Sequence, residues 1–242
     1  MDAYIKTNAG IHKTESEDCV VANNVMIAEA FAQITDLRGI IAVADGVGGH
    51  LGGKTAAGQV CKSLGGVSAV SEDLFAKINK DLIALGNSDP NLTDMATTLS
   101  GLSLPDDGNA QLFHVGNTRI YRINALKYLE QLTQDDTVVE YLVRSGKLTD
   151  EEALSYHGRN EITACFGGGN ESLLHLTLKN IEKHDEAKYL LTSDGVHEYL
   201  SIDDMEDIFE DHLGNWAEIV KQLVEKAVNN GSLDDCTAVI IA

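Results

Sequence analysis

Short apolar runs and longer stretches of helical spacing divide the chain into expected strands and helices. Runs rich in Val, Ile and Leu predict strands at residues 19–22, 39–44, 111–115, 120–123, 189–192 and 237–241. Helical spacing predicts helices at residues 54–64, 74–85 and 137–144, and a last amphipathic helix through Trp216, Ile219, Val220, Leu223, Val224 and Ala227. Because strands and helices come in groups rather than in regular alternation, we expect an antiparallel α+β fold with two sheets between helical layers.

The length and composition predict one domain that spans residues 1–242. Apolar residues make up 43% of the chain and charged residues 23%, which is typical of a globular protein with a sizeable core. Neither an internal repeat nor a linker-like change of composition divides the sequence. The four cysteines are scattered without a C-x-x-C pair, so we expect buried reduced thiols rather than a zinc or redox motif.

The formal net charge of −20 bears on the kind of partner the chain can have. A negative field repels polyanions and anionic lipid headgroups, so we expect neither nucleic acid nor a membrane as a partner. The same charge is equally well explained as a means of staying soluble. No apolar stretch approaches the ~18 residues of a membrane-spanning helix, and the first eight residues lack the features of a signal peptide. We therefore expect a cytoplasmic protein.

Acidic residues stand beside predicted strands in four places, twice followed by glycine. The four places are Asp45-Gly46, Asp194-Gly195, Asp234-Asp235 and Glu17-Asp18. A single Asp-Gly after a strand is usually only a turn, but its recurrence makes coincidence a weaker explanation. Glycine lets backbone carbonyls approach a bound ion closely, and carboxylate oxygens are ligands that Mg²⁺ and Mn²⁺ prefer. These acids therefore predict a metal site.

Clustered carboxylates would repel one another and a phosphate group unless cations lay among them. Two ions about 3.5–4 Å apart can share a water molecule, lower its pKa toward neutrality and orient it for in-line attack on phosphorus. The acids therefore indicate phosphate-ester hydrolysis at a dinuclear site, with no need for a covalent phosphoenzyme.

Seven segments carry a resemblance to a known family. They are residues 10–18 (GIHKTESED), 45–50 (DGVGGH), 96–99 (ATTL), 114–121 (HVGNTRIY), 131–137 (QLTQDDT), 191–195 (LTSDG) and 234–237 (DDCT). Together they resemble the metal-dependent protein phosphatases, also called type 2C serine/threonine phosphatases, in their bacterial form. Lys13 and Ser16 stand where that family has arginine and asparagine, Asn117 replaces its usual aspartate, and Asp136 stands where histidine is common.

The resemblance implies a four-layer α-β-β-α sandwich and two Mg²⁺ or Mn²⁺ ions as cofactors. The implied metal ligands are Asp45 as the bridge, Gly46 through its carbonyl, Asp194 and Asp234 for the first ion, and Glu17 or Asp18 for the second. The implied catalytic residues are Asp45, Asp194, Asp234 and Lys13. Asp235 takes the position of the family's asparagine and ranks below Asp234 as a ligand.

Some side chains keep two interpretations. Lys13 would offer phosphate a point charge rather than a bidentate fork, and a solvated surface lysine is an equally good reading. His12 and His50 are more readily structural or exposed residues than general acids, so the leaving-group acid stays unassigned. Asn117 supplies a neutral amide where a carboxylate would help to hold a third, weaker metal ion, so we expect a third ion to bind poorly.

The function implied is hydrolysis of phosphoserine and phosphothreonine in proteins, by a monomer that opposes a serine/threonine kinase. The main alternative is a catalytically weakened pseudophosphatase that binds phosphoproteins as a regulatory module, which the substitutions at Lys13, Ser16, Asn117 and Asp136 favour. A calcium-binding structural protein is a third reading, although no EF-hand loop is present in the sequence. The sequence does not choose between Mg²⁺ and Mn²⁺, nor name the substrate.

Overall fold

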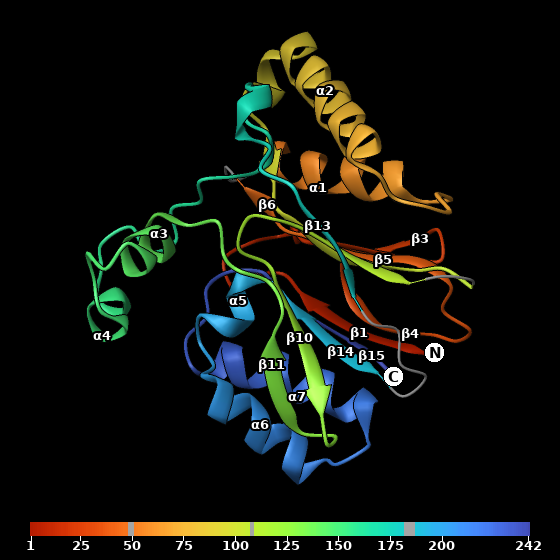
Figure 1. Cartoon of the computed structure of the whole chain (residues 1–242), viewed down its shortest axis with the longest axis vertical. Coiled ribbons are helices and arrows are strands. Elements are labelled where there is room, and N and C mark those ends of the chain that lie inside the picture. Colours follow the sequence, from red (N-terminus) through yellow and green to blue (C-terminus); the bar gives the residue numbers. More distant parts are fainter. Residues whose placement is uncertain (48–50, 107–108, 182–186) are drawn as a thin grey trace.

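Two six-stranded antiparallel sheets face each other between two outer layers of helices (Figure 1). This is the arrangement in the computed structural model, which describes residues 1–47, 51–106, 109–181 and 187–242. It confirms the expected α+β class and the four-layer order of helix, sheet, sheet and helix.

The first sheet lies next to helices α1 and α2 (Figure 1). In spatial order its strands are β13 (Thr177–Ile181), β9 (Ala110–Val115), β8 (Leu99–Leu104), β5 (Gly39–Ala44), β2 (Cys19–Ala22) and β3 (Val25–Ile27). Beside it lies a small sheet of β12 (Phe166–Gly167), β7 (Ala96–Thr97) and β6 (Gly46–Val47).

The second sheet contains strands from both ends of the sequence. In spatial order they are β11 (Tyr128–Gln131), β10 (Arg119–Asn124), β14 (Lys188–Thr192), β15 (Cys236–Ile241), β1 (Ala3–Asn8) and β4 (Ala30–Ile34). Strand β15 lies between β14 and β1, and its register with β1 runs from Ala3 opposite Ile241 to Asn8 opposite Cys236. The two ends of the sequence are thus paired in the interior of this sheet.

The helices form the two outer layers and a projecting flap. They are α1 (Leu51–Leu64), α2 (Glu72–Ser88), α3 (Val138–Arg144), α4 (Asp150–Leu154), α5 (Asp194–His197), α6 (Ile202–Asp211) and α7 (Trp216–Asn229), with 3₁₀ turns η1 (Pro90–Leu92) and η2 (Glu171–Leu173). Within the described residues, no helix is both long enough and apolar enough to cross a membrane.

Three apolar cores lie between the four layers, and the central strands contribute to two of them. In β5, Ile40 and Ala42 pack toward α1 and α2, whereas Ile41 and Val43 pack between the sheets. Successive side chains of a strand point to opposite faces, so a strand buried on both faces is a continuous apolar run. This explains why 39–44 was visible in the sequence.

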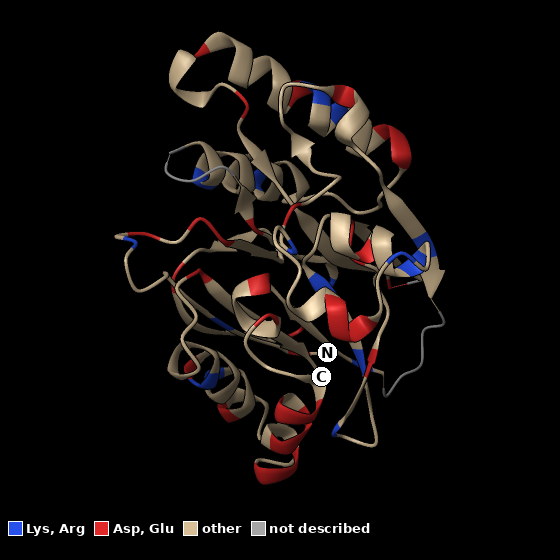
Figure 2. Cartoon of the chain, turned by 90° about the vertical axis from the view of Figure 1, so that its left-hand side faces the viewer, with Lys and Arg blue, Asp and Glu red and all other residues tan. Residues whose placement is uncertain are grey.

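The helix α6 shows how the acidic composition is compatible with a packed core. Its sequence is IDDMEDIFED, and Met205, Ile208 and Phe209 are its buried residues. Apart from the exposed Ile202, acids occupy the rest of the surface of this helix. On the face that carries the flap, acidic positions outnumber basic ones along the helices (Figure 2).

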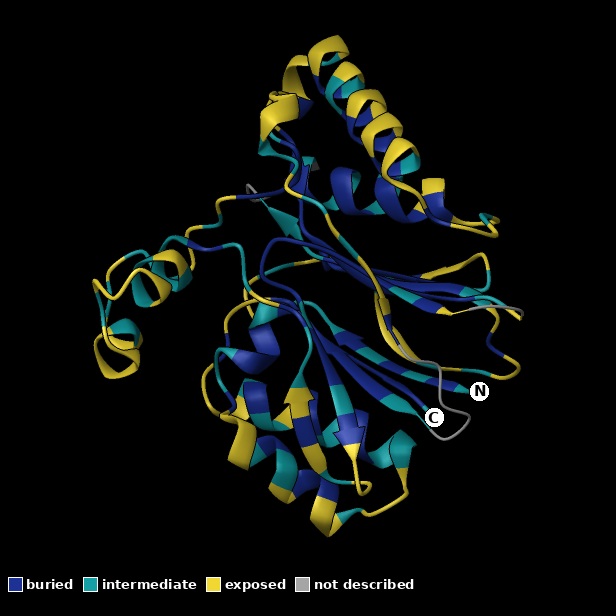
Figure 3. Cartoon of the chain, viewed as in Figure 1, coloured by how far each residue is buried: buried dark blue, intermediate teal, exposed yellow. Residues whose placement is uncertain are grey.

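We call residues 138–161 the flap, because α3 and α4 project away from the layers (Figures 1 and 3). Neither helix has a buried residue, and Tyr141 and Leu154 are largely exposed. The flap is joined to the rest of the fold at a narrow base, where a β-bridge pairs Thr137 with Ile162. Local capping, this base and an ion pair of 2.9 Å between Arg159 of the flap and Glu198, rather than a core, hold the flap in place.

The predicted elements are found close to their expected bounds. Residues 19–22 and 39–44 are β2 and β5, and the other four predicted strands are β9, β10, β14 and β15 with ends shifted by one or a few residues. The predicted helices are α1, α2, α3 and α7, and Thr137 is the N-cap of α3 rather than its first residue. The single-domain expectation stays a prediction.

Candidate metal and phosphate site

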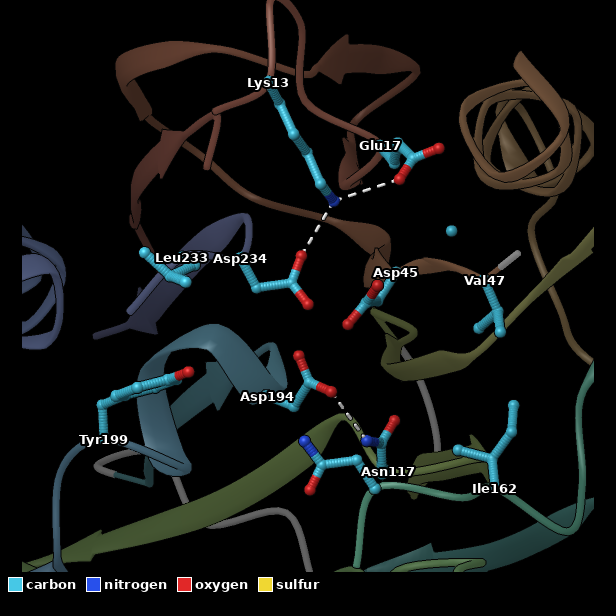
Figure 4. Close-up of a pocket in the computed structure, with 12 residues that line it drawn as sticks. Lys13, Glu17, Asp45, Val47, Asn117, Ile162, Asp194, Tyr199, Leu233 and Asp234 are labelled. Carbon is cyan, nitrogen blue, oxygen red and sulfur yellow. Dashed lines mark hydrogen bonds and ion pairs between the residues drawn. The ribbon is translucent and has the colours of Figure 1, made fainter. Parts of the chain in front are cut away.

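Residues from six separate segments line a pocket of about 440 Å³ (Figure 4). Its lining residues are Lys13, Glu17, Asp45, Gly46, Val47, Asn117, Asn160, Ile162, Asp194, Tyr199, Leu233 and Asp234. Five of the six predicted metal ligands are among them, and Lys13 is there as well. The acids that the sequence places beside different strands therefore share one cavity.

Asp45 follows β5 directly and is fixed through its backbone. Its carbonyl accepts hydrogen bonds from the Thr98 amide (2.9 Å) and the Thr97 hydroxyl (2.8 Å), and its own amide donates to the Thr98 hydroxyl at 3.3 Å. The side chain points into the pocket between Glu17 and Asp194 (Figure 4). The Ala-Thr-Thr-Leu segment thus serves to hold the strand end that carries Asp45.

Asp194 begins the short helix α5 immediately after β14. Its carboxylate accepts a hydrogen bond from the Asn117 amide at 3.0 Å (Figure 4). Glycine is required at the next position, because a Cβ on Gly195 would lie 2.0 Å from the carbonyl oxygen of Asp235. The Asp-Gly pair is therefore a packing requirement and not a free turn.

Lys13 is held by three carboxylates. Its ammonium lies 2.8 Å from Asp234, 2.8 Å from Asp235 and 3.0 Å from Glu17, and its side chain is only 30% exposed. These ion pairs exclude the reading of Lys13 as a freely solvated surface lysine. They also raise its pKa, against the opposing effect of burial.

Asp18 is the predicted ligand that does not line the pocket. It is buried beneath Glu17, and its carboxylate accepts a hydrogen bond from the Thr237 hydroxyl at 2.6 Å. The other oxygen of Asp18 and one oxygen of Glu17 are buried and have no hydrogen-bond partner among the residues that the structure describes. An unpartnered buried carboxylate oxygen is costly, so these two atoms call for a cation.

Burial and mutual repulsion weaken the acidity of the carboxyls. Burial raises the pKa of Asp18 to about 8, opposed by the Thr237 hydrogen bond. Burial and then the charge of Asp234 raise the pKa of Asp194 to about 6, and burial followed by the charge of Asp194 raises that of Asp45 well above its usual range. Nearby cations would favour the ionised forms, so the electrostatics fit a metal site.

The carboxylates of Asp45, Asp194 and Asp234 point toward one another in the pocket (Figure 4), but they are not arranged as a ready-made ligand set. Within residues 1–47, 51–106, 109–181 and 187–242, no three or more His, Cys, Asp or Glu side chains form a ready ligand cluster for an ion. Their oxygen donors nevertheless suit Mg²⁺ or Mn²⁺, and the two orphaned oxygens are unexplained without a cation. We conclude that the residues fit the implied ions.

Several functional contacts were not visible in the sequence. Asp235 was ranked only as a secondary ligand, but its buried carboxylate binds Lys13 and the backbone around it. Thr237 and Asn117 each hold a predicted ligand through one hydrogen bond. The only sequence signal for them was their place in the segments 114–121 and 234–237. Gly48, Gly49 and His50 of the segment 45–50 lie outside the described residues.

Comparison with known proteins gives consistent matches. The family model described as Protein phosphatase 2C matches residues 28–231. The protein phosphatase PhpP of Streptococcus pneumoniae is 30% identical over 254 residues, covering all of this chain and 97% of PhpP. The serine/threonine protein phosphatase PstP of Mycobacterium tuberculosis is 32% identical over 211 residues, covering 83% of this chain and 40% of PstP. The chain thus spans well under half the length of PstP.

Solved structures agree with the sequence matches. The crystal structure of the M. tuberculosis phosphatase PstP/Ppp superposes with a TM-score of 0.82 at 27% identity, covering 99% of this chain and 98% of that one. A structure of the PstP catalytic domain in complex with two manganese ions gives a TM-score of 0.76 at 27% identity, with coverages of 98% and 97%.

Proposed function

Because the chain belongs to the protein phosphatase 2C family, we propose that it hydrolyses phosphoserine and phosphothreonine in proteins with the help of two divalent cations. One observation carries the proposal: Glu17, Asp45, Asp194 and Asp234 line a single pocket that also contains the Lys13 ammonium. An array of hard oxygen donors beside a fixed cation suits the binding of metal ions and a phosphate group.

The acidic residues would hold the ions: the neighbouring side chains of Asp45 and Asp194, together with Asp234, and Glu17 or Asp18 from the loop of residues 10–18. When bound, such ions supply positive charge and a water acidic enough to attack phosphorus at neutral pH. Asn117 keeps the Asp194 carboxylate oriented through its 3.0 Å hydrogen bond. Thr97 and Thr98 keep the Asp45 backbone in place, so that the side chain needs little reorganisation.

Lys13 would attract the phosphate group through its charge. In the structure that charge is shared by Glu17, Asp234 and Asp235, so phosphate must compete with carboxylates for it. This arrangement favours one second candidate, a pseudophosphatase that binds phosphoproteins without turning them over. The retained acids favour the enzyme, since a binding module has no need for a metal-binding array.

The proposed substrates are phosphorylated proteins, because the relatives PhpP and PstP are named protein phosphatases. We propose that the chain opposes a serine/threonine kinase and acts as a monomer in the cytoplasm, without nucleic acid or membrane partners. Manganese is the first ion to test, because two manganese ions occupy a PstP structure. Magnesium has the same preference for oxygen ligands and is the second.

Turnover of two substrates separates these candidates. An aryl phosphate and a phosphothreonine peptide are incubated with the protein and Mn²⁺, Mg²⁺ or chelator. We expect release of inorganic phosphate with either metal and none with chelator. If the protein binds a phosphothreonine peptide and Mn²⁺ but releases no phosphate, the pseudophosphatase is the correct reading.

A further inference from the structure

Asp235 is a buried carboxylate that accepts hydrogen bonds from three donors. Its side chain is 2% exposed. One oxygen accepts from the Gly10 amide at 2.8 Å, and the other accepts from the Glu17 amide and the Lys13 ammonium, each at 2.8 Å. An asparagine could not make the same contacts, because its side chain has one oxygen acceptor and one NH₂ donor. The NH₂ group would face at least one of the three partners, all of which donate.

The loop that carries Lys13 is pinned at both ends. Gly10 lies so close to the segment before β15 that a Cβ on it would meet the carbonyl oxygen of Leu233 at 2.3 Å. The Gly10 and Glu17 amides both bind Asp235, and the Lys13 amide donates to the Gly10 carbonyl at 2.8 Å. With its backbone fixed, the position of the Lys13 ammonium depends on the carboxylates around it.

Two of these carboxylates belong to the proposed metal ligands. The Lys13 ammonium lies 3.0 Å from Glu17 and 2.8 Å from Asp234 (Figure 4). A bound divalent ion needs the same oxygens, so Lys13 and the ion compete for them. Asp235, the third carboxylate that binds Lys13 in the described part of the chain, does not line the pocket. It is therefore not needed as a ligand and can bind Lys13 whether or not an ion is present.

We propose that Asp235 is a positioning residue that retains the Lys13 ammonium beside the metal ligands and so keeps Glu17 and Asp234 available to the ions. This inference rests on the proposed two-metal function. A full negative charge at 2.8 Å in a buried place attracts Lys13 strongly, whereas Asp234 is about half exposed and screened by solvent. Both positions also depart together from the family pattern, with lysine for arginine and aspartate for asparagine.

The proposal predicts opposite effects for the two partners. In Asp235→Asn the ammonium loses its buried counter-charge and turns to Glu17 and Asp234, so Mn²⁺ binding weakens. In Lys13→Met the competitor is gone, so Mn²⁺ binding tightens even though a buried acid has lost its partner. If these residues had a purely structural role, the substitutions would lower the stability of the protein. They would not weaken Mn²⁺ binding in one variant and tighten it in the other.

The test is calorimetric titration of Mn²⁺ into the wild type, Asp235→Asn, Lys13→Met and the double variant. We expect about tenfold weaker binding in Asp235→Asn and about threefold tighter binding in Lys13→Met. In the Lys13→Met background, Asp235→Asn should change the affinity less than about twofold, because it acts through Lys13. Asp36→Asn is the matched control, since it removes a carboxylate from the exposed Arg38 ion pair, and its affinity should stay unchanged.

Each contrary result has a distinct meaning. An equal effect of Asp235→Asn in both backgrounds would overturn the proposal, because the residue would then act through the loop backbone. Unchanged or weakened binding in Lys13→Met would overturn it as well, and this variant decides the matter even if Asp235→Asn does not fold. Wild-type protein that binds Mn²⁺ but never releases phosphate would remove the proposed turnover and leave this inference standing. Wild-type protein that binds no Mn²⁺ would overturn both.

Discussion

The pocket floor and the flap border the same cavity but are stabilised in opposite ways. The floor consists of strand ends and a loop whose supporting residues, such as Thr97, Thr237 and Asp235, are at most 2% exposed. The flap has no buried residue in α3 or α4 and depends on caps, on its narrow base and on the Arg159–Glu198 ion pair. In Figure 3 the central strands are dark blue, which marks buried residues, whereas the helices of the flap are yellow and teal, which mark exposed and intermediate residues. The proposed metal ligands thus lie on the well-packed floor, whereas the flap, which could adapt to a substrate, has no core of its own.

The largest effect is expected from removing a floor carboxylate. Asp45→Ala or Asp194→Ala should lower turnover of a phosphothreonine peptide more than 100-fold, about 3 kcal/mol of transition-state stabilisation, because each takes a charge from the metal site. Circular dichroism should show an unchanged fold. The flap variant Glu151→Ala serves as a control and should retain its rate. Retention of more than about a tenth of the rate in either floor variant would refute the ligand assignment.

A smaller effect is expected at the rim, where Asn117 contacts the floor. In Asn117→Asp the hydrogen bond to Asp194 is lost and the new carboxylate repels it, so turnover at low Mn²⁺ should fall about tenfold. High Mn²⁺ should restore the rate, because a carboxylate here favours a third ion. Turnover against Mn²⁺ concentration and ion occupancy in soaked crystals measure this. Unchanged kinetics and occupancy would reduce Asn117 to a turn residue.

The stability of the metal-free floor should depend on pH. The pKa of Asp18 is raised to about 8 and that of Asp194 to about 6, both mainly by burial. A raised pKa of an acid means that its stabilising contribution is present at low pH and is lost as pH rises through the folded value. In chelator, the melting temperature should therefore fall by at least about 3 °C between pH 5 and pH 8.5.

Two measurements isolate this effect. Saturating Mn²⁺ should remove most of the decrease, because the ions stabilise the ionised carboxylates. In chelator, Asp18→Asn should make the melting temperature less dependent on pH. This result would distinguish the titration of Asp18 from the general charge repulsion of an acidic chain. A steeper decrease in Asp18→Asn than in the wild type would contradict the assignment.

The smallest effect on stability is expected in the flap. Thr149→Ala removes the capping box of α4, worth about 1 kcal/mol to that helix. Because α4 buries no residue, the melting temperature should change by less than about 1 °C, while amide exchange at residues 150–154 accelerates. Aryl phosphate turnover should stay within about twofold.

The matched control is the capping box of α6. Ser201→Ala removes the same motif from a helix that buries Met205, Ile208 and Phe209. Here the melting temperature should fall by about 2–4 °C, because unfolding of the cap is coupled to the core. Equal effects of the two substitutions would show that the flap is as firmly held as the helical layer.

Burial on both faces made a strand predictable only where nearly every position is apolar. Strand β8 (LSGLSL) is buried throughout but was not predicted, because serine and glycine interrupt its apolar positions. Strands such as β5 and β15 are continuous apolar runs and were found from the sequence alone. Strand β1 (AYIKTN) alternates buried and half-buried positions, and the edge strand β4 is mostly exposed, so neither forms an apolar run. Pairing with β15, not the composition of β1, makes that segment a strand.

The candidate site divides in the same way. Asp45, Asp194 and Asp234 stand at strand ends, where local sequence marks them. Asp235 and Thr237 act through contacts to residues 10–18, more than 200 positions away in the chain. Such contacts follow from strand order, which apolar spacing does not determine. The displacement of Asp18 beneath the pocket has the same origin.

The pairing of β1 with β15 also governs when the protein can become active during its synthesis. Lys13 and Glu17 leave the ribosome early, but Asp234 and the strand that separates β14 from β1 are translated some 220 residues later. Until then β1 lacks its inner neighbour and the pocket lacks one wall. We therefore expect the proposed phosphate release to appear in one step, when β15 pairs with β14 and β1.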